Sequence, residues 1–126
     1  MPKLDLQYVV FVQGNFKGVM QTLNGTEEEI IPPKYDEISI EWEGIIVWKY
    51  TLCGAYVNNR LIIPVEYDSI YFDETAIVVS KNGLYGAYSY DGELIVPIEY
   101  YAVDCDLTGI SVKKEKNGEY IPINSI

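Results

Sequence analysis

Short apolar runs alternate with turn-forming residues along most of the chain. Runs rich in β-branched residues lie at 9–12, 45–48 and 77–79, and this composition is typical of β-strands. Helical signals are few, because the helix-favouring acidic residues 27–29 are followed closely by Pro32. Strands separated by turns every ~8–12 residues predict an all-β fold. The turn signals are Asn24-Gly25, Asn58-Asn59, Asn82-Gly83 and Asp91-Gly92.

The strand pattern also repeats, which indicates a repeat architecture. An apolar pair, a proline, two further residues and a tyrosine recur with steps of 32 and 33 residues, inside an aligned block of 20 residues. Partial copies at both ends supply the half units that cap a stacked array. We therefore expect one all-β domain over residues 1–126, with about three antiparallel β repeats of ~33 residues stacked between half-repeat caps. A closed barrel or propeller-like ring of the same units is the alternative. The recurring segments are 30–36, 62–68 and 95–101, and the predicted units are approximately 8–43, 44–75 and 76–108, with a partial cap at 109–126.

Side chains alternate between the two faces of a strand, which assigns directions to the repeated positions. Two positions are apolar in every unit and should face inward, whereas the position between them and the position after them should face solvent. A tyrosine that recurs in every unit should have the same structural role in each, and an isoleucine that recurs in every unit should lie in one shared hydrophobic core. The inward positions hold Ile38, Ile70 and Val103, then Ile40, Phe72 and Cys105. The outward positions hold Ser39, Tyr71 and Asp104, then Glu41, Asp73 and Asp106. The tyrosines are Tyr35, Tyr67 and Tyr100, and the isoleucines are Ile45, Ile77 and Ile110.

The repeated unit resembles the bacterial WG repeat, also called the KWG repeat. That pattern runs Asn-Gly-x-Trp-Gly, two apolar residues, a turn with Gly, an apolar pair, Pro, two residues and Tyr-Asp, and its clearest copy here is residues 82–100. The resemblance covers residues 8–123, but the signature Trp is replaced by Tyr85, Cys53 and Lys17, with Phe16 as a candidate substitute beside Lys17. In the last copy Ile121 stands where Gly is expected. The resemblance implies a β-repeat scaffold that binds proteins and has no shared catalytic residues.

Composition narrows the possible functions further. Nineteen acidic residues face nine basic ones, so the net charge is −10, which argues against direct binding to nucleic acid or to anionic membranes. The chain has no histidine, which removes the usual general base and the commonest metal ligand. No catalytic motif, EF-hand spacing or cofactor fingerprint occurs, so we expect no enzyme activity, no metal and no cofactor. Cys53 and Cys105 fit no metal or redox motif, and we expect unpaired thiols and a cytoplasmic location.

The repeated acids and the unshared aromatics mark a candidate binding surface. A ladder of like charges costs stability, so the acids either keep the protein soluble or meet a basic partner. Aromatics that the other units lack are candidates for partner contacts, because Trp and Tyr are enriched at binding hot spots. The candidate partner-binding residues are Glu41, Trp42, Glu43, Trp48, Tyr71, Asp73, Tyr101 and Asp106.

These features predict a non-enzymatic, acidic protein-binding module for a basic protein partner, in a bacterial or phage setting. A small acidic protein suits an inhibitor or immunity protein that masks a basic face of its partner. The same charge is compatible with a phage anti-defence protein or a nucleic-acid mimic. A carbohydrate-binding or scaffold repeat is a further alternative. Sugar-binding sites combine an exposed aromatic ring with nearby carboxylates, and Trp42 with Glu41 and Glu43 provides this combination. An enzyme would need an unrecognised pair of carboxylates.

Overall fold

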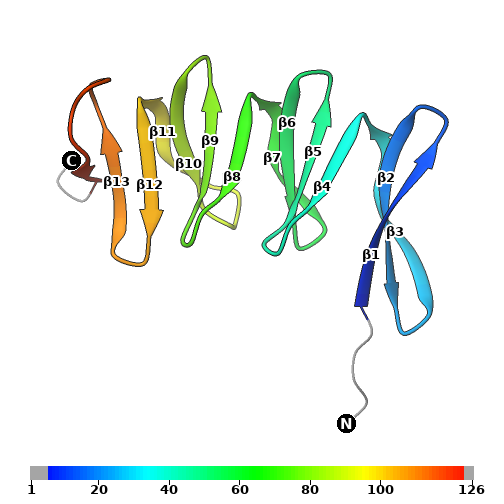
Figure 1. The fold of residues 1–126 in the computed structure, drawn as a ribbon. Coiled ribbons are helices and arrows are strands. Elements are labelled where there is room, and N and C mark those ends of the chain that lie inside the picture. The colour runs from blue at the N-terminus through cyan, green and yellow to red at the C-terminus, as the bar shows by residue number, and fades with distance from the viewer. Residues whose placement is uncertain (1–5, 124–126) are drawn as a thin grey trace, which may run out of the picture.

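The strands form four antiparallel sheets in an open row. The computed structural model describes residues 6–123, and the row does not close into a barrel or ring (Figure 1). The all-β, stacked-repeat prediction is therefore confirmed. The first sheet contains β1 (Leu6–Gln13), β2 (Phe16–Leu23) and β3 (Thr26–Tyr35). The second contains β4 (Glu37–Ile40), β5 (Ile45–Lys49), β6 (Leu52–Val57) and β7 (Arg60–Tyr67). The third contains β8 (Ser69–Phe72), β9 (Ile77–Lys81), β10 (Leu84–Tyr88) and β11 (Leu94–Tyr100). The fourth contains β12 (Ala102–Asp106), β13 (Gly109–Lys113) and β14 (Ile121–Pro122).

Each of the first three sheets ends at the repeated tyrosine. The chain passes from one sheet to the next at Asp36, Asp68 and Tyr101. The units expected from the sequence period begin instead at residues 44 and 76, which lie between the first two strands of the second and third sheets. Residues 1–5 and 124–126 of the expected domain lie outside the described residues.

A β-bulge in which three residues lie opposite one explains the signature glycine of the repeat. Cys53 pairs with Tyr67 and Ala55 pairs with Ile63, so Gly54 alone lies opposite residues 64–66. A Cβ atom on Gly54 would lie 2.6 Å from the Ile63 carbonyl oxygen, which is closer than van der Waals contact permits. The same approach occurs at Gly18 and Gly86, at 2.5 and 2.6 Å from the carbonyl oxygens of Ile31 and Val96. Each bulge contains the repeated proline, which is tolerated where no ladder bond is needed.

The fourth sheet shows why its copy of the motif tolerates a different residue. Ile121 occupies the signature glycine's place, because it pairs with Val112 as Gly86 pairs with Val79. Among the described residues no strand pairs with the other side of β14. Within residues 6–123, Ile121 therefore faces no bulged strand of the kind that lies opposite Gly18, Gly54 and Gly86.

Successive sheets pack face to face with an offset. In the second and third sheets, the first two strands contact the previous sheet, as β4 contacts β2 and β5 contacts β3. Three separate apolar clusters fill the three junctions between sheets. The repeated tyrosines are all buried at the ends of β3, β7 and β11, so their predicted equivalence is confirmed. The prediction of one core is wrong: Ile45, Ile77 and Ile110 belong to three different clusters, because each sheet pair encloses its own.

The inward assignment holds for most strands and fails at Ile40. Phe72, the equivalent residue in the next unit, stacks on Tyr90 with ring centroids 6.2 Å apart. The residue that corresponds to Tyr90 beside Ile40 is Asn58, which is too small and polar to cover it. Ile40 is consequently 37% exposed.

Candidate functional site

The tip of the β4–β5 turn presents the most exposed aromatic side chain of the described residues. Glu41 N donates to the Gly44 carbonyl oxygen at 2.9 Å, which closes a tight turn with Trp42 and Glu43 at its tip. Trp42 is fully exposed, at 101% of its reference area. The corresponding tip of the β12–β13 turn carries Leu107, which is 84% exposed. Because this place lies outside the packed core, the fold does not need the indole ring there.

An apolar groove runs beside this tryptophan. It has a volume of about 620 Å³ and is lined by Leu6 and Tyr8 of β1 and by Ile40, Glu41 and Trp42. A smaller hollow on the same turn contains Glu43 and the β6–β7 turn residues Asn58 and Asn59. We call Leu6, Tyr8, Ile40, Glu41, Trp42 and Glu43 the Trp42 edge. This edge combines an exposed apolar surface with two carboxylates that have no ion-pair partner among residues 6–123.

The other two acids of the predicted column have internal roles. Asp73 Oδ2 accepts a hydrogen bond from Cys105 N at 3.0 Å, and its Oδ1 accepts one from Glu74 N at 3.0 Å. Asp73 therefore links the third sheet to the fourth. Asp106 Oδ1 accepts hydrogen bonds from Thr108 N at 2.8 Å and from Thr108 Oγ1 at 2.5 Å, and these bonds lower the pKa of Asp106. The three acids of the predicted outward column therefore differ in their surroundings, since backbone N–H groups donate to Asp73 and Asp106.

The remaining candidate aromatics lie apart from the Trp42 edge. Trp48 lies toward the other end of β5, three residues and so about 10 Å along the strand from Ile45, where the turn that carries Trp42 ends. It is half-buried between Glu37 on β4 and Cys53 on β6. Tyr71 on β8 is 66% exposed, and Tyr101, between β11 and β12, is 46% exposed. The structure thus brings Glu41, Trp42 and Glu43 together but does not gather all eight candidates into one site.

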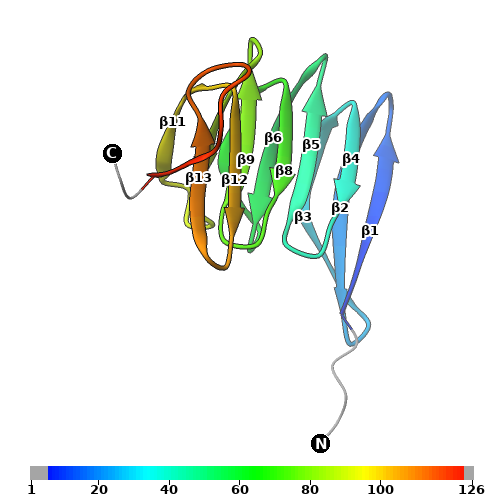
Figure 2. The ribbon, with the colours of Figure 1, turned by 60° about the vertical axis from the view of Figure 1, so that its left-hand side comes forward.

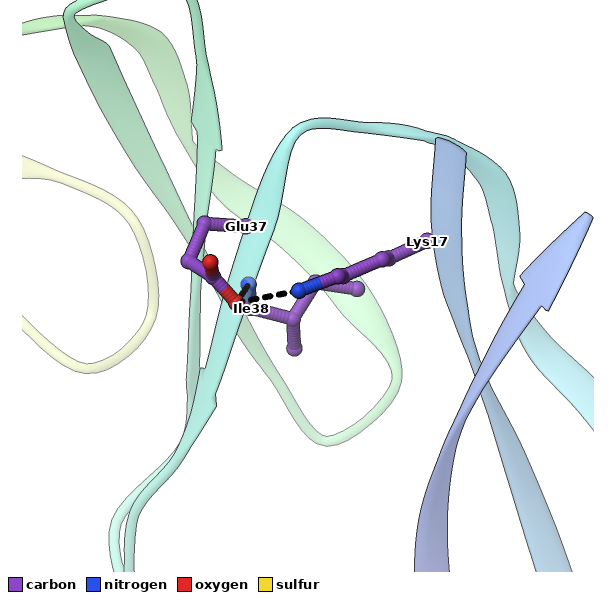
Figure 3. Close-up of polar contacts among 3 residues, drawn as sticks. All are labelled: Lys17, Glu37 and Ile38. Atoms are coloured by element: carbon purple, nitrogen blue, oxygen red, sulfur yellow. Dashed lines mark hydrogen bonds and ion pairs between the residues drawn. The ribbon is translucent and has the colours of Figure 1, made fainter. Parts of the chain in front are cut away.

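The first copy of the signature contains a charged residue in the place of the tryptophan. Lys17 pairs with Tyr35 as Cys53 pairs with Tyr67, so Lys17 and not Phe16 occupies that place. Its Nζ forms an ion pair with Glu37 Oε1 at 2.9 Å, and Ile38 N donates to the same oxygen at 3.4 Å (Figure 3). The hydrogen bond from Lys17 lowers the pKa of Glu37. This contact joins the first sheet to the second.

A second groove was not predicted. It has a volume of about 530 Å³ and lies around Tyr50, which is 83% exposed and has a left-handed backbone with φ of 59°. Asn82 occupies the equivalent place, and asparagine tolerates this conformation better than tyrosine. Asp36 and Asp68 stabilise the two turns by accepting hydrogen bonds from Tyr50 N and Asn82 N, at 2.5 and 2.8 Å. The sequence feature that could have revealed this groove is Tyr50, which stands at the turn position where the next unit has Asn82. The groove is lined by Lys34, Tyr35, Lys49, Tyr50, Leu52, Leu61, Pro64 and Val65.

The buried polar groups are paired with one another or with backbone groups. Tyr35 and Tyr56 share a hydroxyl–hydroxyl hydrogen bond of 2.9 Å, and burial raises the pKa of Tyr35. Cys53 Sγ donates to the Tyr67 carbonyl oxygen at 3.4 Å. Burial raises the pKa of both Cys53 and Cys105 to about 11, so both are free, protonated thiols at neutral pH. Protonated thiols are poor nucleophiles.

Residues 6–123 contain neither a cluster of metal-ligating side chains nor a membrane-spanning helix. No group of three or more Cys, Asp or Glu residues in this range is arranged to hold a metal ion. This range also contains no helix long and apolar enough to cross a membrane.

Comparison with known families agrees with the repeated geometry. The family model of the WG containing repeat matches residues 23–46 and 57–85. Comparisons with curated proteins and with solved structures found no match. The matched segments include the bulged strands β3 and β7, in which the repeated proline lies opposite the signature glycine. The chain is a WG-repeat protein.

Proposed function

We propose that this protein is a non-enzymatic binding module that recognises a basic protein through the Trp42 edge. The observation that carries the proposal is a fully exposed indole between Glu41 and Glu43, beside the apolar Leu6, Tyr8 and Ile40. A large aromatic ring buried on binding supplies contact area, and neighbouring charges select the partner. Because the fold does not need this ring, a role in binding accounts for its presence.

Charge supports a basic partner. The chain has a net charge of −10, and the Trp42 edge contributes two carboxylates that form no ion pair with any residue in the range 6–123. Complementary charge speeds the encounter of two proteins and suppresses wrong partners. Inhibition of a toxin or nuclease by masking its basic nucleic-acid-binding face fits this chemistry, whether the protein is an immunity protein or a phage anti-defence protein. In this proposal the protein acts in the cytoplasm, where free thiols such as Cys53 persist.

The proposal is tested by capture on matched variants. Wild-type protein, Trp42→Ala and Leu107→Ala are immobilised separately and exposed to extract from cells that produce the protein. Leu107 is the control, because it is an exposed apolar residue at an equivalent turn. We expect one basic protein to bind the wild type and Leu107→Ala, to elute with rising salt, and to bind Trp42→Ala at least about tenfold more weakly, as for a ~2 kcal/mol hot-spot residue. Equal capture by all three forms would contradict the proposal.

A carbohydrate-binding repeat is the second candidate function. An exposed indole flanked by carboxylates can stack on a sugar ring while the carboxylates accept hydrogen bonds from hydroxyl groups. Trp42, Glu41 and Glu43 provide this combination. A glycan array distinguishes the two functions: Trp42-dependent binding to one glycan class would favour this candidate over the protein-binding module.

A further inference from the structure

The first strand has an open edge that its counterparts in the other sheets do not have. Gly18 in the first sheet corresponds to Gly54 in the second, so the pairing registers make β1 the counterpart of β5. The strands β5, β9 and β13 each have hydrogen-bonded neighbours on both sides, whereas β1 pairs only with β2 among the described residues. Figure 2 shows β1 at the outer end of the row. In the other sheets this edge is occupied by the short strands β4, β8 and β12.

This open edge lacks the features that normally protect edge strands. Natural edges are blocked by charged side chains, proline or bulges. The eight residues of β1 include no charge and no proline, and their pairing with β2 is regular throughout. Val9, Val10 and Val12 are 50%, 36% and 65% exposed. An edge of this kind favours pairing with another strand.

The other sheets define what kind of strand fits the open edge. On β4, Ile38 lies opposite Val47 of β5 and Ile40 lies opposite Ile45. The edge of β5 therefore pairs with two apolar residues separated by one position. Phe11 and Val9 are the equivalents of Val47 and Ile45. An incoming antiparallel strand therefore needs two apolar residues with the same spacing, to lie opposite Phe11 and Val9.

We propose that the occupant is the β1 strand of a second copy of this chain, in an antiparallel dimer with its two-fold axis at Val10. In this register Val9 of one copy lies opposite Phe11 of the other, so β1 supplies the spacing that the edge requires. The two three-stranded sheets then form one continuous six-stranded sheet. Because β1 contains no charged residue, no like charges face each other across the new pair, although each molecule has a charge of −10.

The backbone geometry is consistent with this register. Gln13 and Phe16 close a two-residue turn, and such a closing pair exchanges hydrogen bonds. Hydrogen-bonding direction alternates along a strand, so Val12, Val10 and Tyr8 direct their N–H and C=O groups toward the open edge. In the proposed dimer Val10 faces Val10 and Tyr8 faces Val12, which pairs these groups with one another. Salt should promote the dimer, since it screens the mutual repulsion of two acidic molecules.

The oligomeric state of the full chain tests the proposal. Sedimentation equilibrium is measured over a wide protein concentration range for the wild type, Val10→Lys and Leu107→Lys. The control Leu107→Lys places the same charge on an exposed apolar residue far from β1. We expect the wild type and the control to dimerise, more tightly at higher salt. Val10→Lys should dissociate at least about tenfold more readily, because it places two ammonium groups opposite each other. A monomeric wild type, or a dimer that Val10→Lys leaves intact, would overturn the proposal.

A cross-link provides a second test that does not depend on the lysine variant folding well. Directly opposed residues in antiparallel strands lie at a separation that a disulfide can bridge. Val10→Cys should give a covalent dimer on mild oxidation, whereas Tyr8→Cys should not, because residue 8 lies opposite residue 12. The native Cys53 and Cys105 are buried and give little background. Cross-linking of Tyr8→Cys but not of Val10→Cys would contradict the proposed register.

Discussion

The tyrosine pair at the first sheet junction should stabilise the stack through its shared hydrogen bond. Tyr35 and Tyr56 are 2% and 8% exposed, their rings meet edge to face with centroids 6.2 Å apart, and their hydroxyl groups lie 2.9 Å apart. Changing one of them to Phe leaves the other hydroxyl group without its partner in an apolar cluster. Such a loss costs about 1–3 kcal/mol of unfolding free energy. Changing both removes the polar pair altogether, and replacing both partners by apolar groups is often nearly neutral.

The assay is urea unfolding of the wild type, Tyr35→Phe, Tyr56→Phe and the double variant. We expect the double variant to lose less stability than the sum of the two single variants, with a coupling of about 1 kcal/mol or more. Tyr100→Phe is the control: Tyr100 is the equivalent of Tyr35, but the place that corresponds to Tyr56 is Ile123, and we expect a change within about 0.5 kcal/mol. Additive single variants, or a loss for Tyr100→Phe as large as for Tyr35→Phe, would refute this reasoning.

The remaining predictions concern the bulge and the thiols. Gly54→Ala should lower the free energy of unfolding by about 1–3 kcal/mol, because its Cβ would lie 2.6 Å from the Ile63 carbonyl oxygen. The control Gly118→Ala, where the closest contact is 3.3 Å, should cost clearly less in the same chemical unfolding experiment. Cys53 and Cys105, with pKa values raised to about 11, should resist a thiol reagent at pH 8 until the protein unfolds. A pKa that folding raises implies stability that is present below pH ~9 and is lost as the pH rises through 11. Between pH ~9 and 11, the melting temperature should therefore fall less for Cys53→Ala than for the wild type. Melting temperatures that fall equally in the two proteins would count against burial of the thiol.

The repeat made the fold predictable from the sequence. Tyr35, Tyr67 and Tyr100 recur at one place because each closes the same junction between sheets, so identical residues marked identical environments. Alternation then separated buried from exposed positions along each strand. It failed at Ile40, because the covering residue is Tyr90 in the next unit and Asn58 here. A pattern within one strand contains no information about the residue that packs on it from elsewhere.

The candidate site was predictable only in part. Trp42 and its flanking acids were identified because the other units have no aromatic residue there. The hydrogen bond from Cys105 N to Asp73 was not predicted, since the donor belongs to the next sheet and leaves no trace in the sequence. The Lys17–Glu37 ion pair joins strands of different sheets and was missed for the same reason. Contacts between units depend on how the sheets are offset, which the repeat period does not determine.

The most direct test of the proposed function is site-specific photo-crosslinking from position 42. A photoreactive phenylalanine analogue is placed at Trp42, or at Leu107 as a control on the equivalent turn, and the protein is irradiated in the cells that produce it. The proposed function predicts one basic protein attached from position 42 and not from position 107. It also predicts that changing Glu41 and Glu43 to Gln sharply reduces this adduct, because the steering charges are lost. An absence of any adduct specific to position 42, or an adduct indifferent to both charge changes, would contradict the proposal that the Trp42 edge binds a basic partner.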